Sequence, residues 1–144
     1  MIEASGINHI GIAVRSLSEH REYYEDVLGA AYEGTEEVPS QKVRVAFYRL
    51  GPDDAPVRLE LLEPTAEDSP IARFLEKRGE GVHHVAYTVA DIDERLRELK
   101  EKGIRLIDET SRPGAHGAMI GFLHPKSTGG VLTELCEPGR ASGS

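Results

Sequence analysis

The chain has 144 residues, a hydrophobic fraction of 39% and a formal net charge of −8 at pH 7. This is about the length of one ordinary domain, and the apolar fraction is sufficient for a hydrophobic core. The negative charge disfavours binding to nucleic acid, and no apolar run approaches the roughly 18 to 20 residues of a membrane span. The only cysteine is Cys136, and the N-terminus does not resemble a secretory signal, so we expect a cytoplasmic protein without an internal disulfide.

An internal duplication organises the sequence. The segment INHIGIAV at 7–14 matches VHHVAYTV at 82–89, and each is followed by a helical pattern, at 16–29 and at 91–103. Both patterns begin with a capping residue and end at a glycine. Further on, VAFYRL at 45–50 matches MIGFLHP at 119–125, and RLELLEP at 58–64 matches LTELCEP at 132–138. The repeat predicts an α+β fold built from two tandem βαβββ modules.

The repeat also predicts the limits of the modules. We expect a single domain over residues 1–138, with module one at about 5–64, a linker at about 65–80 and module two at about 81–138. The linker is expected to hold a short helix near 70–78, because Pro70 suits a first helical turn. Residues 139–144, GRASGS, have nothing to bury and are expected to form a disordered tail.

Four polar residues recur at matched strand positions. Because side chains alternate along a strand, each module places one histidine and one glutamate on the face away from its helix: His9, Glu60, His84 and Glu134. Any one of them alone would more often be structural or exposed. Polar residues duplicated on the same face of two sheets need a partner, and two imidazoles with two carboxylates suit Co²⁺, Mn²⁺, Ni²⁺, Fe²⁺ or Zn²⁺. The pattern therefore predicts a divalent metal site with open coordination positions.

From about residue 7 to 138, the sequence resembles the methylmalonyl-CoA epimerase family of the vicinal oxygen chelate superfamily. The most specific marks are DSPIARFLEKRGEGVHHVAY and GAHGAMIGFLHPKSTGGVLTEL. The resemblance implies a curved mixed sheet around the metal site, the glyoxalase fold, and a homodimer. It also implies an isomerase of propionate metabolism, which interconverts (2R)- and (2S)-methylmalonyl-CoA by α-proton transfer through an enolate. Co²⁺ is the expected ion, with Mn²⁺, Ni²⁺ or Zn²⁺ as alternatives.

Carried over position by position, the resemblance assigns the metal to the same four residues and makes Glu134 one of two catalytic bases. The family's second base, a glutamate, corresponds to Ser40 in EEVPSQKVRVAF. A serine cannot act as a general base at neutral pH without help. Glu37 or its neighbour Glu36 is then the expected replacement, unless the chain has reduced activity.

Two further residues lie in segments that resemble the substrate side of the family. His116 stands in the loop PGAHGAM, and Lys126 follows Pro125 in a hairpin that is expected to approach the phosphates of an acyl-CoA substrate. For each of them an exposed position without a binding role is the competing interpretation.

Two other functions compete with an epimerase. Glyoxalase I, which acts on a hemithioacetal, uses the same kinds of metal ligand in bacteria, so the ligands cannot separate the two; the linker helix and the HPKSTGG hairpin favour the epimerase. A metal-free protein of the same fold that binds small molecules is the other alternative, but that function has no use for four duplicated ligands.

Overall fold

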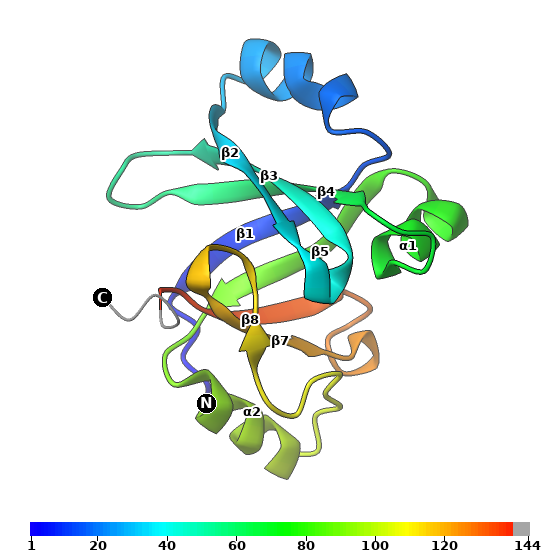
Figure 1. Ribbon diagram of the computed structural model, residues 1–144. Coiled ribbons are helices and arrows are strands. Elements are labelled where there is room, and N and C mark those ends of the chain that lie inside the picture. The colour runs from blue at the N-terminus through cyan, green and yellow to red at the C-terminus, as the bar shows by residue number, and fades with distance from the viewer. Residues whose placement is uncertain (140–144) are drawn as a thin grey trace. The chain divides into compact units, whose positions relative to one another are not determined.

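The computed structural model describes residues 1–139, in two compact units (Figure 1). The first unit contains residues 9–83, and the second contains residues 1–8 and 84–139. Each unit carries one copy of the duplicated strand pattern. Within residues 1–139 no helix has both the length and the apolar character that crossing a membrane requires.

The strands of the first unit are β1 (Gly6–Ala13, of which residues 6–8 belong to the second unit), β2 (Ala31–Val38), β3 (Val43–Leu50) and β4 (Val57–Pro64), in the spatial order β2-β3-β4-β1. β1 runs parallel to β4, whereas β2, β3 and β4 form an antiparallel meander. A short 3-10 turn (η3, Pro39–Gln41) connects β2 with β3. The parallel pair is possible because a long connection with helical turns separates β1 from β2.

The helical pattern at 16–29 corresponds to a helical segment after β1. It consists of a 3-10 turn (η1, Ser18–His20) and a π-helix (η2, Glu22–Val27). The backbone N–H of Leu28 donates to the carbonyl of Tyr23, five residues earlier, at 2.8 Å, so the turn is wider than in an α-helix. This geometry leaves Tyr24 stacked on Tyr48, with ring centroids 5.6 Å apart. The helical segment predicted at 16–29 is therefore present, as a 3-10 turn and a π-helix.

The core of the first unit lies between this helical segment and one face of the sheet. It is formed by buried residues from β3, β4 and the ends of the helical connection: Val14, Ala30, Ala46, Tyr48 and Leu61. Ile12 and Leu59 pack against the cluster, so the helix side of these strands is apolar, as expected if His9 and Glu60 lie on the other face.

The predicted linker helix is present as α1 (Pro70–Arg78). Ser69 caps it, since its fully buried side chain accepts a hydrogen bond from the N–H of Ile71 at 3.1 Å. The helix ends at Gly79, whose φ of 76° is readily adopted only by glycine.

The second unit repeats the same topology. After β5 (Gly81–Thr88) come α2 (Ile92–Glu101), the two-residue β6 (Arg112–Pro113), β7 (Met119–Leu123) and β8 (Thr133–Glu137), in the order β5-β8-β7-β6. Two 3-10 turns, η4 (Ala115–Gly117) and η5 (Pro125–Ser127), flank β7. β5 is parallel to β8, and the other pairs are antiparallel. The prediction of two tandem βαβββ modules in an α+β fold is therefore confirmed.

The core of the second unit lies beneath α2. Its buried members are Val89, Ile92, Leu96, Leu123 and Leu135. Ile2 packs against this cluster and the N–H of Ser5 donates to the carbonyl of Thr88 at 2.9 Å, which ties the N-terminal residues to this unit. The predicted disordered tail falls, apart from Gly139, outside the described residues.

Candidate metal centre and active site

In the first unit, His9 and Glu60 form a buried pair. Nδ1 of His9 lies 3.1 Å from Oε2 of Glu60, and the two residues are 4% and 9% exposed. The pairing of β1 with β4 brings them together, because Gly11, two residues after His9, is the register partner of Glu60. Across the other edge of β4, Glu60 faces Phe47, which is 1% exposed.

The second unit holds the equivalent pair. Nε2 of His84 lies 3.3 Å from Oε1 of Glu134, and these residues are 5% and 4% exposed. Ala86, two residues after His84, is the register partner of Glu134, as Gly11 is of Glu60. Phe122 faces Glu134 across β7 and β8, and its ring meets the imidazole of His84 edge to face at 5.4 Å. The duplication therefore extends to strand register, burial and aromatic neighbour.

The chemistry of these two pairs fits a divalent cation. A buried carboxylate is costly unless positive charge balances it, and neutral imidazole nitrogens with carboxylate oxygens are suitable ligands for transition metals. His9, His84 and Glu134 each offer one buried atom of a kind that ligates metal ions. Glu60 is not one of these three, but its Oε2 contacts His9. The four residues singled out by strand alternation are thus buried, and within each unit the histidine contacts the glutamate.

The two carboxylates considered as replacement bases lie on opposite faces of β2. Glu36 pairs with Val45 on β3, and Val45 pairs with Leu62 on β4. Leu62 lies two residues after Glu60, so Glu36 is on the same face of the sheet as Glu60. Glu37 instead shares a row with Arg44 and Glu63, on the side of the sheet that packs against the helical segment.

Glu37 is also engaged on that far side. Its Oε1 accepts a hydrogen bond from Nη2 of Arg44 at 2.8 Å, and Nη1 of the same arginine donates to Glu63 at 2.7 Å. Glu63 in turn accepts from the backbone N–H of Leu17 at 2.9 Å. Glu37 therefore belongs to a network that anchors the helical connection, whereas Glu36 has the parity of the His9–Glu60 pair. Ser40 lies exposed in the turn η3.

The second unit has an arginine where the first has Glu36. Arg112 pairs with Ile120 on β7, and Ile120 pairs with Cys136, which lies two residues after Glu134 on β8. In the first unit, Glu36 has the same relation to Glu60, through Val45 and Leu62. The Arg112 guanidinium lies over the ring of Phe122 at 5.6 Å. A long side chain at this register position therefore reaches back to the aromatic residue beside the histidine and glutamate pair.

The two residues expected to bind substrate lie in the 3-10 turns η4 and η5. His116 is exposed at the centre of η4 with a left-handed backbone, at φ 56° and ψ 34°. Lys126 is exposed in η5, where its backbone N–H donates to Nδ1 of His124 at 3.1 Å. Their binding roles remain predictions.

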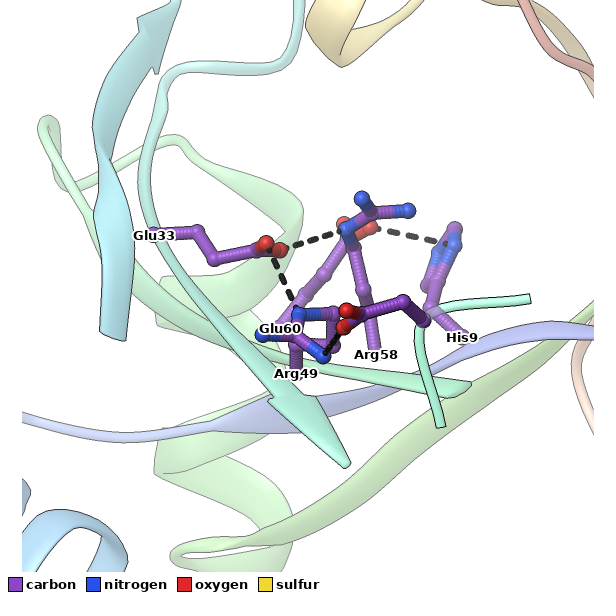
Figure 2. Close-up of polar contacts among 6 residues, drawn as sticks. His9, Glu33, Arg49, Arg58 and Glu60 are labelled. Atoms are coloured by element: carbon purple, nitrogen blue, oxygen red, sulfur yellow. Dashed lines mark hydrogen bonds and ion pairs between the residues drawn. The ribbon is translucent and has the colours of Figure 1, made fainter. Parts of the chain in front are cut away.

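Beside the first pair lies an ionic cluster that the sequence analysis missed (Figure 2). Glu33 Oε1 accepts from Nε of Arg58 at 2.9 Å, and Glu33 Oε2 accepts from Nε of Arg49 at 3.2 Å. Partial burial favours the neutral acid, but the hydrogen bonds and charges of Arg58 and Arg49 outweigh it and lower the pKa of Glu33 below its ordinary value. We call these three residues the arginine cluster. Only strand register and the β-bulge between Tyr32 and Thr35 bring them together, so the linear sequence carries no direct signal for them.

On the helix side of the same sheet, Tyr48 is buried and donates a hydrogen bond to Oε2 of Glu25 at 2.8 Å. Burial, together with this hydrogen bond and the charge of Glu25, raises the pKa of Tyr48 to about 12. Arg21 holds Glu25 from the other side, with Nε 2.8 Å from the same carboxylate oxygen. This face therefore carries a structural network, separated by the sheet from Glu60.

Comparison with known proteins agrees with the duplicated geometry. Residues 8–122 match the model of the glyoxalase, bleomycin resistance protein and dioxygenase superfamily. The chain belongs to this superfamily. Both histidine and glutamate pairs lie in the repeated βαβββ units that such a fold provides, and the predicted glyoxalase-type fold class is confirmed.

Individual members of the superfamily resemble the chain over most of its length. An uncharacterised protein of Bacillus subtilis, YqjC, is 48% identical over 92% of this chain and 91% of its own. The mitochondrial methylmalonyl-CoA epimerase of Bos taurus is 43% identical, over 90% of this chain and 72% of its own. A solved structure of a methylmalonyl-CoA epimerase in complex with methylmalonyl-CoA and NH4⁺ is 40% identical and superposes with a TM-score of 0.89, covering 96% of this chain and 98% of that one.

Proposed function

We propose that this protein is a methylmalonyl-CoA epimerase, an isomerase that interconverts the (2R) and (2S) epimers by moving the α-proton. The Bos taurus relative and the solved structure that bear this name cover 90% and 96% of this chain, at 43% and 40% identity. The single structural observation that carries the proposal is the duplicated buried pair, His9 with Glu60 and His84 with Glu134.

These four residues are proposed to hold one divalent ion. A mixed set of nitrogen and oxygen donors suits Co²⁺, with Mn²⁺, Ni²⁺ or Zn²⁺ as alternatives. When bound, such an ion supplies positive charge that stabilises the enolate oxygen as it develops. The imidazoles are neutral in this role, and the carboxylates offset the positive charge while they fix the position of the site.

Epimerisation requires one group that removes the α-proton and a second group that returns a proton to the opposite face of the same carbon. We assign Glu134 to one of these roles, since one of its carboxylate oxygens can accept a proton while the other serves as a ligand. Glu36 is the better candidate for the second role than Glu37, because it has the strand parity of Glu60. Ser40 takes no proton-transfer role in this scheme.

The remaining parts of the proposal concern the whole protein. We expect a homodimer in the cytoplasm and one functional domain over residues 1–138, with an acyl-CoA as the substrate. His116 and Lys126 are proposed to contact that substrate from η4 and η5.

The test is α-proton exchange. The cobalt-loaded protein is incubated with methylmalonyl-CoA in deuterium oxide, and the α-proton signal and the ratio of epimers are followed by NMR, with an EDTA-treated sample as the control. We expect exchange with epimerisation only in the loaded protein. If the loaded protein exchanges no proton but isomerises the hemithioacetal of methylglyoxal, it is a glyoxalase and the proposal is wrong.

A further inference from the structure

The arginine cluster lies on the same face as the His9–Glu60 pair and next to it. In the parallel ladder, Arg58 is the register partner of His9, and it precedes Glu60 by two residues on β4, so all three side chains lie on one side of the sheet. Arg49 is the register partner of Arg58 on β3 and continues the same row. In Figure 2, both arginines and Glu33 stand beside His9 and Glu60.

The cluster contains more guanidinium groups than its one internal carboxylate can neutralise. Glu33 is the shared acceptor, and Arg49 makes a further ion pair through Nη1 with Asp53, at 2.6 Å. The Asp53 side chain is 94% exposed, so this contact is screened by water and contributes little. The cluster therefore keeps a net positive charge beside the histidine and glutamate pair.

Arg58 is the member that presents its donors to a ligand. Within residues 1–139 its side chain makes a single hydrogen bond, from Nε to Glu33, and the side chain is 32% exposed. An arginine has five N–H donors in a planar fork, so the two terminal amino groups of Arg58 remain available for a bidentate anion. Glu33, held also by Arg49, fixes the direction of that fork.

We infer that Arg58 forms a subsite for the free carboxylate of the acyl group, with Glu33 and Arg49 as its positioning residues. The inference rests on the proposed function, which supplies an acyl group with such a carboxylate. An acyl-CoA also carries phosphates, and a guanidinium fork binds both kinds of anion. The position of Arg58 favours the carboxylate. Neighbouring strands are only about 4.8 Å apart, so Arg58 lies directly beside the His9–Glu60 pair. The phosphates of an acyl-CoA, in contrast, are separated from the acyl group by a long pantetheine arm.

The subsite makes a prediction about ligand classes. Dissociation constants are measured by calorimetry on the metal-loaded protein for methylmalonyl-CoA, for methylmalonyl-pantetheine, which lacks the nucleotide, and for propionyl-CoA, which lacks the free carboxylate. In Arg58→Gln we expect binding of both methylmalonyl ligands to weaken about 10-fold to 100-fold, the effect of losing a charge-assisted hydrogen bond. Propionyl-CoA should bind the variant and the wild type equally.

Arg44→Gln is the matched control. Arg44 lies on β3, is also held by carboxylates and faces the opposite side of the sheet, so its loss should leave all three constants unchanged. Arg58→Lys keeps the charge without the fork and should retain part of the affinity. Thermal unfolding of each variant establishes that it is folded.

Two results would overturn the subsite. If Arg58→Gln binds all three ligands as the wild type does, Arg58 contacts no ligand. If it weakens both CoA ligands equally but not methylmalonyl-pantetheine, it binds a phosphate. Neither result affects the epimerase proposal, which depends on whether the wild type exchanges the α-proton. If the wild type binds methylmalonyl-CoA without exchanging its α-proton, the protein is not an epimerase, but the binding constants of the variants still test the carboxylate subsite.

Discussion

Glu36 and Glu37 are adjacent in β2 but face opposite sides of the sheet, Glu36 toward the side of Glu60 and Glu37 toward Arg44 and Glu63. They therefore form a matched pair for testing the second base. We expect Glu36→Gln to lower the epimerisation rate about 100-fold to 10,000-fold, the usual contribution of a general acid or base. Glu37→Gln should stay within a few-fold of the wild type.

The Glu36 assignment also predicts which proton is lost. With each epimer supplied separately in deuterium oxide, Glu36→Gln should still exchange the α-proton of one epimer through Glu134, without inversion, and should fail with the other. Glu134→Gln should show the opposite preference if it retains metal. Equal exchange of both epimers in Glu36→Gln would remove Glu36 from the mechanism.

Metal content gives a test that needs no turnover. His84→Ala removes one of the buried nitrogen donors, so we expect metal affinity to fall by more than the roughly 10-fold to 100-fold that loss of an outer-shell partner costs. Glu60→Gln keeps an oxygen donor and should keep most of the metal. The stoichiometry of bound cobalt after dialysis distinguishes these outcomes.

His20→Ala is the control for the metal measurement. Nε2 of His20 lies 2.9 Å from Oε2 of Glu80, and neither residue belongs to the two buried pairs, so the replacement of His20 should not change bound metal. Full metal content in His84→Ala would exclude this residue as a ligand.

The candidate metal residues were predictable because strand alternation depends only on local geometry. His9 and Glu60 recur as His84 and Glu134 at matched positions, and period two places each on the face away from the apolar residues. The limits of α1 were predictable for the same reason, since Pro70 at the first turn and Gly79 at the end act locally.

Features that depend on long-range register were not predictable. The neighbours of Glu33 are set by a β-bulge and by two strand pairings, none of which leaves a signal near Glu33 itself. The π-helix at Glu22–Val27 was likewise missed, because the stacking of Tyr24 on Tyr48 from β3 is a tertiary contact. Glu37 was preferred over Glu36 as a base from sequence, although strand parity, once register is known, favours Glu36.

Backbone and side-chain roles of His116 can be separated by comparing two substitutions. His116 has a φ of 56°, which costs an alanine about 1 kcal/mol but a glycine very little. If the imidazole binds substrate, His116→Ala and His116→Gly should both raise KM about 2-fold to 10-fold, as expected for one neutral hydrogen bond. A raised KM in the alanine variant alone would mean that only the shape of the loop matters.

The raised pKa of Tyr48 predicts a loss of stability at high pH. The folded-state pKa is about 12 and the ordinary value is 10, so the protonated hydroxyl stabilises the folded protein fully below pH 10 and progressively less as the pH approaches 12. Between pH 9 and pH 11 the wild type should lose about 1 kcal/mol more of its free energy of unfolding than Tyr48→Phe does, since each pKa unit corresponds to about 1.4 kcal/mol. Denaturant titrations at both pH values measure this difference. Tyr23→Phe, at a tyrosine that is 52% exposed, is the control and should lose as much free energy of unfolding as the wild type does. If Tyr48→Phe also loses as much as the wild type, the Tyr48 hydroxyl titrates alike in the folded and unfolded states.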